Sequence, residues 1–254
     1  MVTEPSSALA SRASPGAARW RTGVALLLAG FALAVLGAAL LLSALNAANA
    51  QRFLDDWGRT GQTPDPRAFA AAEAAAIRAV RFYPGAAGEH WDRLGRVYSW
   101  AHWRAPVADG DSAMPGLAAA HLLENPLGEQ AATDVDATRR RALVAFENAV
   151  RHRPLWPYGQ VRLADAQRRA GVDGEALSHR LQRAFALGPW RPAVNRRIAA
   201  MGLRGWDALT PAARDVVLTN ARRAVRYSDA DRQHVIDVAR QTGHSVLIDA
   251  LVLP

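Results

Sequence analysis

The sequence of 254 residues contains no cysteine and no lysine, so each of its 31 basic side chains is an arginine. Without cysteine the chain forms neither a disulfide framework nor a thiolate metal site. The sequence therefore does not indicate whether its compartment is oxidising or reducing. The exclusive use of arginine beside abundant alanine is more typical of a GC-rich bacterial genome than of selection for guanidinium chemistry. The net charge of +8 still suits an anionic partner.

The sequence also lacks the common catalytic motifs GxSxG, HExxH, GxxxxGKS/T and GxGxxG. None of the seven histidines has another at the i, i+4 spacing of a helical zinc site. Asp109-Gly110-Asp111 lacks the other ligands of a calcium loop. The acidic pairs Asp55-Asp56 and Glu89/Asp92 are better explained as solvated, helix-capping carboxylates than as a glycosidase acid and base. We therefore predict that the protein is not an enzyme and holds no metal or cofactor.

The longest hydrophobic run covers residues 24–42, where every residue is apolar or glycine. A helix rises about 1.5 Å per residue, so this run spans roughly the 30 Å of a bilayer's hydrocarbon core. Arginines precede the run and uncharged polar residues follow it, so the positive-inside rule places the N-terminus in the cytoplasm. We predict a disordered basic tail at 1–23, a transmembrane helix at 24–45 and a juxtamembrane linker at 46–64, in which the helix can continue to Trp57.

A cleavable signal peptide is the alternative, because Ala48-Asn49-Ala50 looks like a small-residue cleavage site. We favour an uncleaved anchor, since the apolar run exceeds the roughly 7 to 15 residues of a signal core. In both interpretations the rest of the chain is exported from the cytoplasm. The anchor predicts a single-pass protein of the bacterial inner membrane, with its C-terminal domain in the periplasm.

The remaining sequence contains spacings that are typical of tetratricopeptide (TPR) repeats, in which about 34 residues form two antiparallel helices. One segment matches the first-helix pattern W-x-x-L-G-x-x-Y, and two later segments match positions of the second helix and the proline after it. The matching positions are Trp91, Leu94, Gly95, Tyr98, Ala142, Phe146, Ala149, Pro154, Ala176, Ala184 and Pro189. We predict an all-α fold over 65–254, a TPR-like right-handed stack of helical hairpins, with an insertion at 105–134 between the two helices of one repeat.

Helix start and stop residues divide this domain further. Asp65-Pro66 and Thr210-Pro211 each supply an N-cap followed by a proline in the first turn, and Ser228 caps a later helix. We expect Gly202 and Gly205 to end the helix that begins near Trp190. The helices expected in the domain, including the two helices of the first repeat at 89–104 and 139–153, cover 67–82, 89–104, 117–123, 139–153, 190–201, 211–227, 229–241 and 244–253.

Tryptophan occurs 8 times, and many of these rings gather around the repeat segments. Indole faces suit sugar rings and apolar peptide segments. The candidate surface for a partner protein or a glycan comprises Trp100, Trp103, Trp156, Tyr158, Arg168, Arg169 and Trp190. We expect Trp190, like Trp91, to pack in the core, whereas neither alternative is favoured for Trp100 and Trp103. Arginine pairs such as Arg196-Arg197 are more simply solvated helix faces than a groove for an anionic polymer.

Three strings, PLWPY at 154–158, GPWRP at 188–192 and GLRGWDAL at 202–209, resemble VpsP-type proteins of bacterial exopolysaccharide biosynthesis. The resemblance extends from about residue 54 to the C-terminus. It implies a singly anchored inner-membrane protein with an accessory role beside a polymerase, a chain-length regulator and export machinery, and it carries over no catalytic residue. Similar strings occur in the periplasmic repeat domains of polymerase and ligase-like membrane proteins of the same pathways.

Our leading hypothesis is a membrane-anchored scaffold in exopolysaccharide biosynthesis or export. Its expected partners are protein components of the polymerisation and export machinery and the lipid of the inner membrane, with a glycan as a further candidate ligand and no nucleic acid. One alternative is an enzyme that processes the glycan at a site in the insertion, using Asp109, Asp111, His102 and His121. Another alternative is an assembly factor for a different envelope complex.

Overall fold

The computed structural model describes residues 15–85, 87–102, 135–171 and 174–252. The predicted all-α fold is confirmed, and no strand occurs within these ranges. The helices are α1 (Pro15–Thr60), α2 (Pro66–Phe82), α3 (Gly88–Ala101), α5 (Val135–His152), α6 (Pro157–Arg169), α7 (Gly174–Leu187), α8 (Pro192–Arg204), α9 (Pro211–Tyr227), α10 (Asp229–Gln241) and α11 (Ser245–Val252), with the short 3-10 helix η3 (Trp206–Ala208). The predicted insertion at 105–134, with its helix at 117–123, lies outside the described residues.

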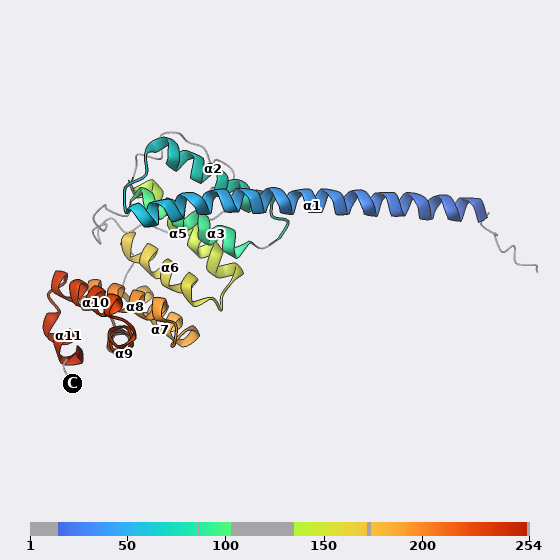
Figure 1. The fold of residues 1–254 in the computed structure, drawn as a ribbon. Coiled ribbons are helices and arrows are strands. Elements are labelled where there is room, and N and C mark those ends of the chain that lie inside the picture. The colour runs from blue at the N-terminus through green and yellow to red at the C-terminus, as the bar shows by residue number, and fades with distance from the viewer. Residues whose placement is uncertain (1–14, 86, 103–134, 172–173, 253–254) are drawn as a thin grey trace, which may run out of the picture.

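α1 is one continuous helix of 46 residues that projects far beyond the other helices (Figure 1). Its projecting part carries exposed leucines, and the helix is long and apolar enough to span a membrane. α1 already begins at Pro15, so residues 15–23 are helical, whereas we predicted a disordered tail there.

The C-terminal part of α1 belongs to the folded domain. Its buried apolar positions recur every three or four residues: Ala47, Ala50, Leu54 and Trp57. This period gives α1 a face that packs on α2 and α3. The helix ends at Thr60, where Gly61 adopts a φ of 63° and donates its N–H to the Trp57 carbonyl at 2.8 Å. The segment 46–64, expected to be a linker, is therefore a packed helix as far as Thr60.

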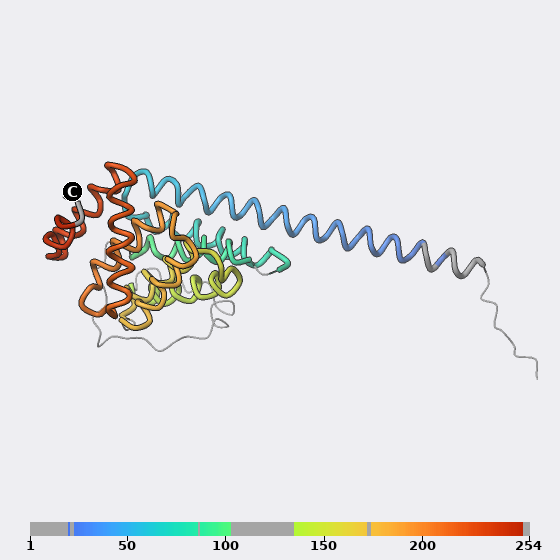
Figure 2. Tube along the Cα trace, turned by 90° about the horizontal axis from the view of Figure 1, so that it is seen from below, coloured from blue at the N-terminus to red at the C-terminus, as the bar shows by residue number. Residues whose placement is uncertain are grey.

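The other helices each pack on the next one along the chain, and short turns reverse the chain direction between most of them (Figures 1 and 2). Three predicted helix starts are confirmed by their caps. Asp65 Oδ1 accepts hydrogen bonds from the N–H groups of Arg67 and Ala68 at 2.9 and 3.0 Å. The hydroxyls of Thr210 and Ser228 cap α9 and α10 in the same way.

α8 differs from its prediction, because Gly202 lies inside the helix and does not end it. A methyl group added at Gly202 would lie 2.8 Å from Cγ1 and 2.9 Å from Cβ of Val217 on α9. The glycine therefore allows a close crossing of α8 and α9, and the helix continues to Arg204.

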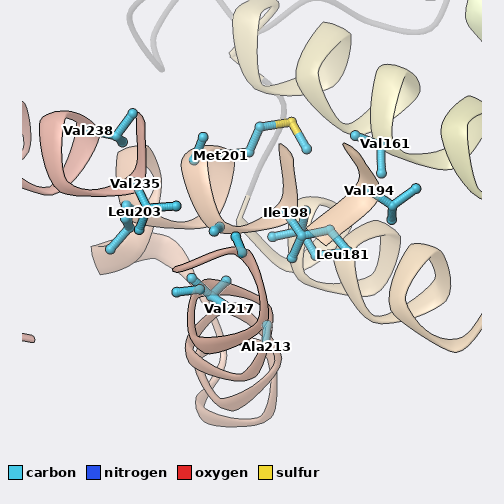
Figure 3. Packing of buried hydrophobic residues seen from close by; sticks show 14 of the residues in the cluster. Val161, Leu181, Val194, Ile198, Met201, Leu203, Ala213, Val217, Val235 and Val238 are labelled. Carbon is cyan, nitrogen blue, oxygen red and sulfur yellow. The ribbon is translucent and has the colours of Figure 1, made fainter. Parts of the chain in front are cut away.

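Two hydrophobic cores stabilise the domain, and α6 contributes to both. Leu163 and Ala166 of α6 pack with α1, α2, α3 and α5, while Val161 and Ala164 pack with α7 to α11. We call the cluster formed with α1, α2, α3 and α5 the first core, and the cluster formed with α7 to α11 the second core. Figure 3 shows the second core, in which Ile198 of α8 and Val217 of α9 are fully buried. The two cores meet along α6.

Candidate functional site

An open pocket of about 440 Å³ lies where the two cores meet. It is lined by α1, α3, α5, α6, α8 and α10 through Leu54, Gly58, Arg96, Ser99, Trp100, Phe146, Val161, Arg162, Asp165, Arg169, Arg197, Ala200, Met201, Arg204 and His234. Five of these side chains are arginines, and Asp165 is the one acid among them. We call this site the arginine pocket.

Helical periodicity explains why these arginines converge. Arg162 and Arg169 are seven residues apart on α6, and Arg197 and Arg204 are seven residues apart on α8. Residues two turns apart lie on the same face of a helix. Arg96 adds a fifth guanidinium from α3. The neighbouring faces of three helices therefore direct positive charge into one space.

Carboxylates neutralise only part of this charge. Arg162 forms an ion pair with the buried carboxylate of Asp92. Asp165 accepts hydrogen bonds from both Arg168 and Arg169 at 3.0 Å. Asp92 was predicted to be a solvated capping acid, and this is wrong, because its side chain lies inside the domain where it requires a cationic partner.

Three arginines of the pocket form no ion pair within the described part of the chain, and the more distant carboxylates of Asp92 and Asp165 offset only part of their charge. Arg96 donates to the amide oxygen of Gln51 at 3.2 Å, and Arg204 donates to a carbonyl of its own helix at 3.4 Å. Arg197 forms no hydrogen bond or ion pair with any described residue. The pocket therefore carries an excess of positive charge that an anion would neutralise.

The titration behaviour of these arginines reflects their crowding. Burial, together with the charge of Arg162, lowers the pKa of Arg96 to about 10. Burial is also the main cause of a lowered pKa at Arg197 and Arg204; the charges of neighbouring arginines lower both pKa values further, and the carboxylate of Asp165 opposes this in part. The groups still carry their protons at neutral pH. A bound anion would raise these pKa values and relieve the repulsion.

His102, at the C-terminal end of α3, is almost fully buried. Burial first, and then the charges of Arg169 and Arg139, lower its pKa to about 4, so the ring is neutral at pH 7. The unfolded chain binds a proton near pH 6.5, so the stability contributed by neutral His102 is lost as pH falls from about 6.5 to about 4. Its predicted companions Asp109, Asp111 and His121 lie outside the described residues.

The structure separates the predicted aromatic and arginine surface into different places. Trp100 and Arg169 line the arginine pocket, and the Trp100 ring meets the Trp57 ring edge-on at 6.1 Å. Trp156 lies beside the pocket, with the Arg162 guanidinium 5.3 Å from its ring centre. The ring centres of Tyr158 and Trp156 are 5.7 Å apart. Arg168 forms an ion pair with Asp165. Trp103 lies outside the described residues.

Trp190 and Trp91 were both expected in the core, and only Trp91 lies there. Trp190 is 78% exposed on the turn before α8, and the Arg223 guanidinium covers its ring at 4.1 Å. This cation–π contact fixes the ring at the surface. Trp91 is 7% exposed and packs in the first core. The core expectation for Trp190 is therefore wrong.

Sequence reasoning missed Arg96, Arg162 and Arg204 and assigned Arg197 to a solvated face. The repeated seven-residue spacing of arginines on α6 and α8 was the available signal. Among the described residues, no group of three or more acidic or histidine side chains is arranged to hold a metal ion. Comparison with known proteins finds no matching family model, no similar curated protein and no similar solved structure.

Proposed function

We propose that this protein is a membrane-anchored scaffold that uses the arginine pocket to bind an acidic segment of a partner protein. The observation that carries the proposal is the group of three pocket arginines, Arg96, Arg197 and Arg204, none of which forms an ion pair with a described carboxylate. Guanidinium groups recognise carboxylates through paired, charge-assisted hydrogen bonds. Several convergent guanidiniums therefore favour a ligand with more than one carboxylate. The role is binding and not catalysis.

The proposed architecture is a TPR-like stack of helical hairpins. Its support is the packing of α3 on α5, which carry the first-helix and second-helix positions of one repeat. A methyl group added at Gly95 of α3 would lie 2.7 to 2.9 Å from the Phe146 ring of α5, so the glycine makes room for that ring. Ala142 and Ala149 are buried on the same helix as Phe146.

The proposed setting is exopolysaccharide biosynthesis or export at the bacterial inner membrane, with the domain in the periplasm. The setting rests on the resemblance of the strings at 154–158, 188–192 and 202–209 to VpsP-type proteins. A polymerase, a chain-length regulator or an export protein would supply the acidic segment. The long apolar part of α1 would keep the scaffold beside such membrane-bound partners.

A second candidate is an anionic glycan in the same pocket. The observation in its favour is Trp100, whose indole lines the pocket together with the arginines. An indole face beside guanidiniums suits a sugar that carries a carboxylate. Both candidates use the same charges, so they differ in the molecule recovered with the protein and not in the residues required.

Charge reversal inside the pocket tests the proposal. The full-length variants Arg197→Glu and Arg222→Glu undergo the same change of charge, but Arg222 lies exposed on α9 and does not line the pocket. Arg197→Glu removes repulsion with Arg162 and adds repulsion with Asp165, so the far-UV circular dichroism of both variants is compared with that of the wild type before recovery is scored. Each form is crosslinked in host membranes, purified after mild solubilisation, and analysed for bound protein and glycan.

We expect a partner protein that is recovered with the wild type and with Arg222→Glu and is reduced about tenfold or more with Arg197→Glu, equivalent to at least about 1.4 kcal/mol. A peptide from its acidic segment should bind the purified protein, and the peptide with Glu replaced by Gln should not. Equal recovery with all three forms would refute the pocket as the binding site. Recovery of glycan alone would select the second candidate.

A further inference from the structure

The turn between α2 and α3 lies beside the part of α1 that is apolar and exposed. Ser43 Oγ of α1 donates to the Ala79 carbonyl of α2 at 2.7 Å, and Arg78 Nε donates to Asn46 Oδ1 at 2.8 Å. These two contacts show that the helices run antiparallel, because a later residue of α2 meets an earlier residue of α1. Figures 1 and 2 both show the α2–α3 turn beside α1, towards its projecting end.

The contacts define a register that extends beyond Ser43. From Ala79 beside Ser43, each further residue of α2 lies at the level of an α1 residue one position earlier, so Phe82, the last residue of α2, lies at the level of Leu40, and the turn begins there. Leu36 and Leu40 are 42% and 40% exposed, whereas Leu27, nearer the N-terminus of α1, is 76% exposed. The end of α2 therefore lies beside the apolar, exposed part of α1.

The depth of this turn in a bilayer follows from the rise of the helix. The apolar run at 24–42 is centred near residue 33, and half of a hydrocarbon core of about 30 Å corresponds to about ten residues. The boundary of the hydrocarbon then lies near Ser43. Residues at the level of Leu40 would lie about 5 Å inside that boundary.

The composition of the turn suits this depth. Phe82, Tyr83, Pro84 and Gly85 carry no charge, and Tyr83 packs edge-on against His90 with ring centres 5.2 Å apart. The preceding Arg81 is exposed, so its guanidinium can extend to phosphate groups while its stem stays apolar. Aromatic residues beside arginines are typical of the membrane–water boundary.

We propose that residues 82–85 insert into the outer part of the bilayer and form a second membrane contact beside α1. The proposal rests on the proposed membrane anchor and goes beyond it, because two contacts fix the orientation of the domain where a single helix would let it pivot. Leu54 and Gly58, which line the arginine pocket, then lie about 16 and 22 Å from the hydrocarbon boundary. The acidic segment of a partner therefore has to lie about 16 to 22 Å from the hydrocarbon boundary to enter the pocket.

The absence of native cysteine makes single-cysteine labelling direct. We would attach the environment-sensitive dye NBD to Gly85→Cys, Leu33→Cys and Gln62→Cys in the full-length protein, reconstituted in phospholipid vesicles. A side chain at Gly85 meets only ordinary contact with Tyr83 at 3.6 Å, and Gln62 is exposed at the opposite end of the α1–α2 hairpin. Tyr83→Cys provides a second probe of the turn. Lipids with a doxyl quencher near the headgroup or deep in the acyl chain report the depth.

We expect NBD at Gly85→Cys and Tyr83→Cys to emit at shorter wavelength and to lose most of its emission to the shallow quencher. NBD at Leu33→Cys should be quenched most by the deep quencher, and NBD at Gln62→Cys by neither. If Leu33→Cys is quenched while both turn probes behave like Gln62→Cys, the second contact is refuted and the anchor stands. If Leu33→Cys is not quenched either, the membrane anchor itself fails and the inference fails with it.

Discussion

Substitution of glycine by alanine at two helical positions should change stability in opposite directions. A methyl group added at Gly202 of α8 would lie within 3 Å of side-chain carbons of Val217 on α9. No atom lies within 4 Å of a methyl group added at Gly58 of α1. Both glycines have helical neighbours, so the intrinsic preference of a helix for alanine applies to both. The two variants therefore separate the steric cost from the conformational gain.

The magnitudes follow from this geometry. Alanine in place of a helical glycine contributes about 0.5 to 1 kcal/mol of stability, and this is the whole effect expected for Gly58→Ala. At Gly202 the added methyl group would overlap Val217 Cγ2, so the α8–α9 contact has to open or Val217 has to change its rotamer, at an overpacking cost of about 3 kcal/mol. We therefore expect Gly202→Ala to lower the free energy of unfolding by about 2 kcal/mol.

Urea unfolding of the full-length protein in detergent micelles, followed by far-UV circular dichroism, measures both effects. With an m-value of about 2 kcal/mol/M, the midpoint should fall by about 1 M for Gly202→Ala and rise slightly for Gly58→Ala. Val217→Ala removes the carbons that clash, so the double variant with Gly202→Ala should be more stable than the sum of the single effects predicts. Additive effects, or a stable Gly202→Ala variant, would refute the close crossing of α8 and α9.

Three further predictions concern charge and processing. Asp92→Ala should lower the free energy of unfolding by about 3 kcal/mol in urea titrations, because it leaves Arg162 unpaired among other arginines. His102→Asn should remove about 3 kcal/mol of the stability loss between pH 6.5 and pH 4, since neutral His102 is the favoured folded form. Intact-mass analysis of protein from host membranes should show no cleavage after Ala50, which is fully buried in the first core.

Each of these predictions has its own control. Adding Arg162→Met to Asp92→Ala should restore most of the lost stability, and no recovery would show that the ion pair is not the cause. His152 is exposed, so His152→Asn should leave the dependence of the free energy of unfolding on pH unchanged. An identical slope in His102→Asn would refute the assignment to the buried ring. A mature chain beginning at residue 51 would show that Ala50 is not required in the core.

Local patterns made most of the helices predictable. A cap such as Asp65 acts on amides two and three residues away, and the apolar run at 24–42 needs no tertiary partner to be recognised. The pairing of α3 with α5 was expected because the two segments match the first and second helices of one repeat pattern, and the structure then places the Phe146 ring against Gly95. In each case the decisive contacts are short-range or follow a repeated motif.

The features that sequence reasoning missed depend on contacts between distant segments. Gly202 looked like a helix end because a glycine favours helix termini as well as close crossings, and only the approach of Val217 distinguishes the two. Trp190 looked like a core residue until Arg223, 33 positions later, was found to cover it. The pocket required the relative placement of α3, α6 and α8, which no single helix encodes.

The place of the arginine pocket gives ligand binding a structural consequence. Arg96 belongs to a helix of the first core, whereas Arg197 and Arg204 belong to a helix of the second, and α6 is shared by both cores. An anion that bonds to Arg96 and Arg197 together would connect the two cores across the pocket and replace their repulsion with attraction. Binding would therefore stiffen the domain along α6 as well as hold the partner. A ligand with a single carboxylate at one arginine would neutralise charge without making this connection, so the proposed binding role would favour extended, multiply charged segments.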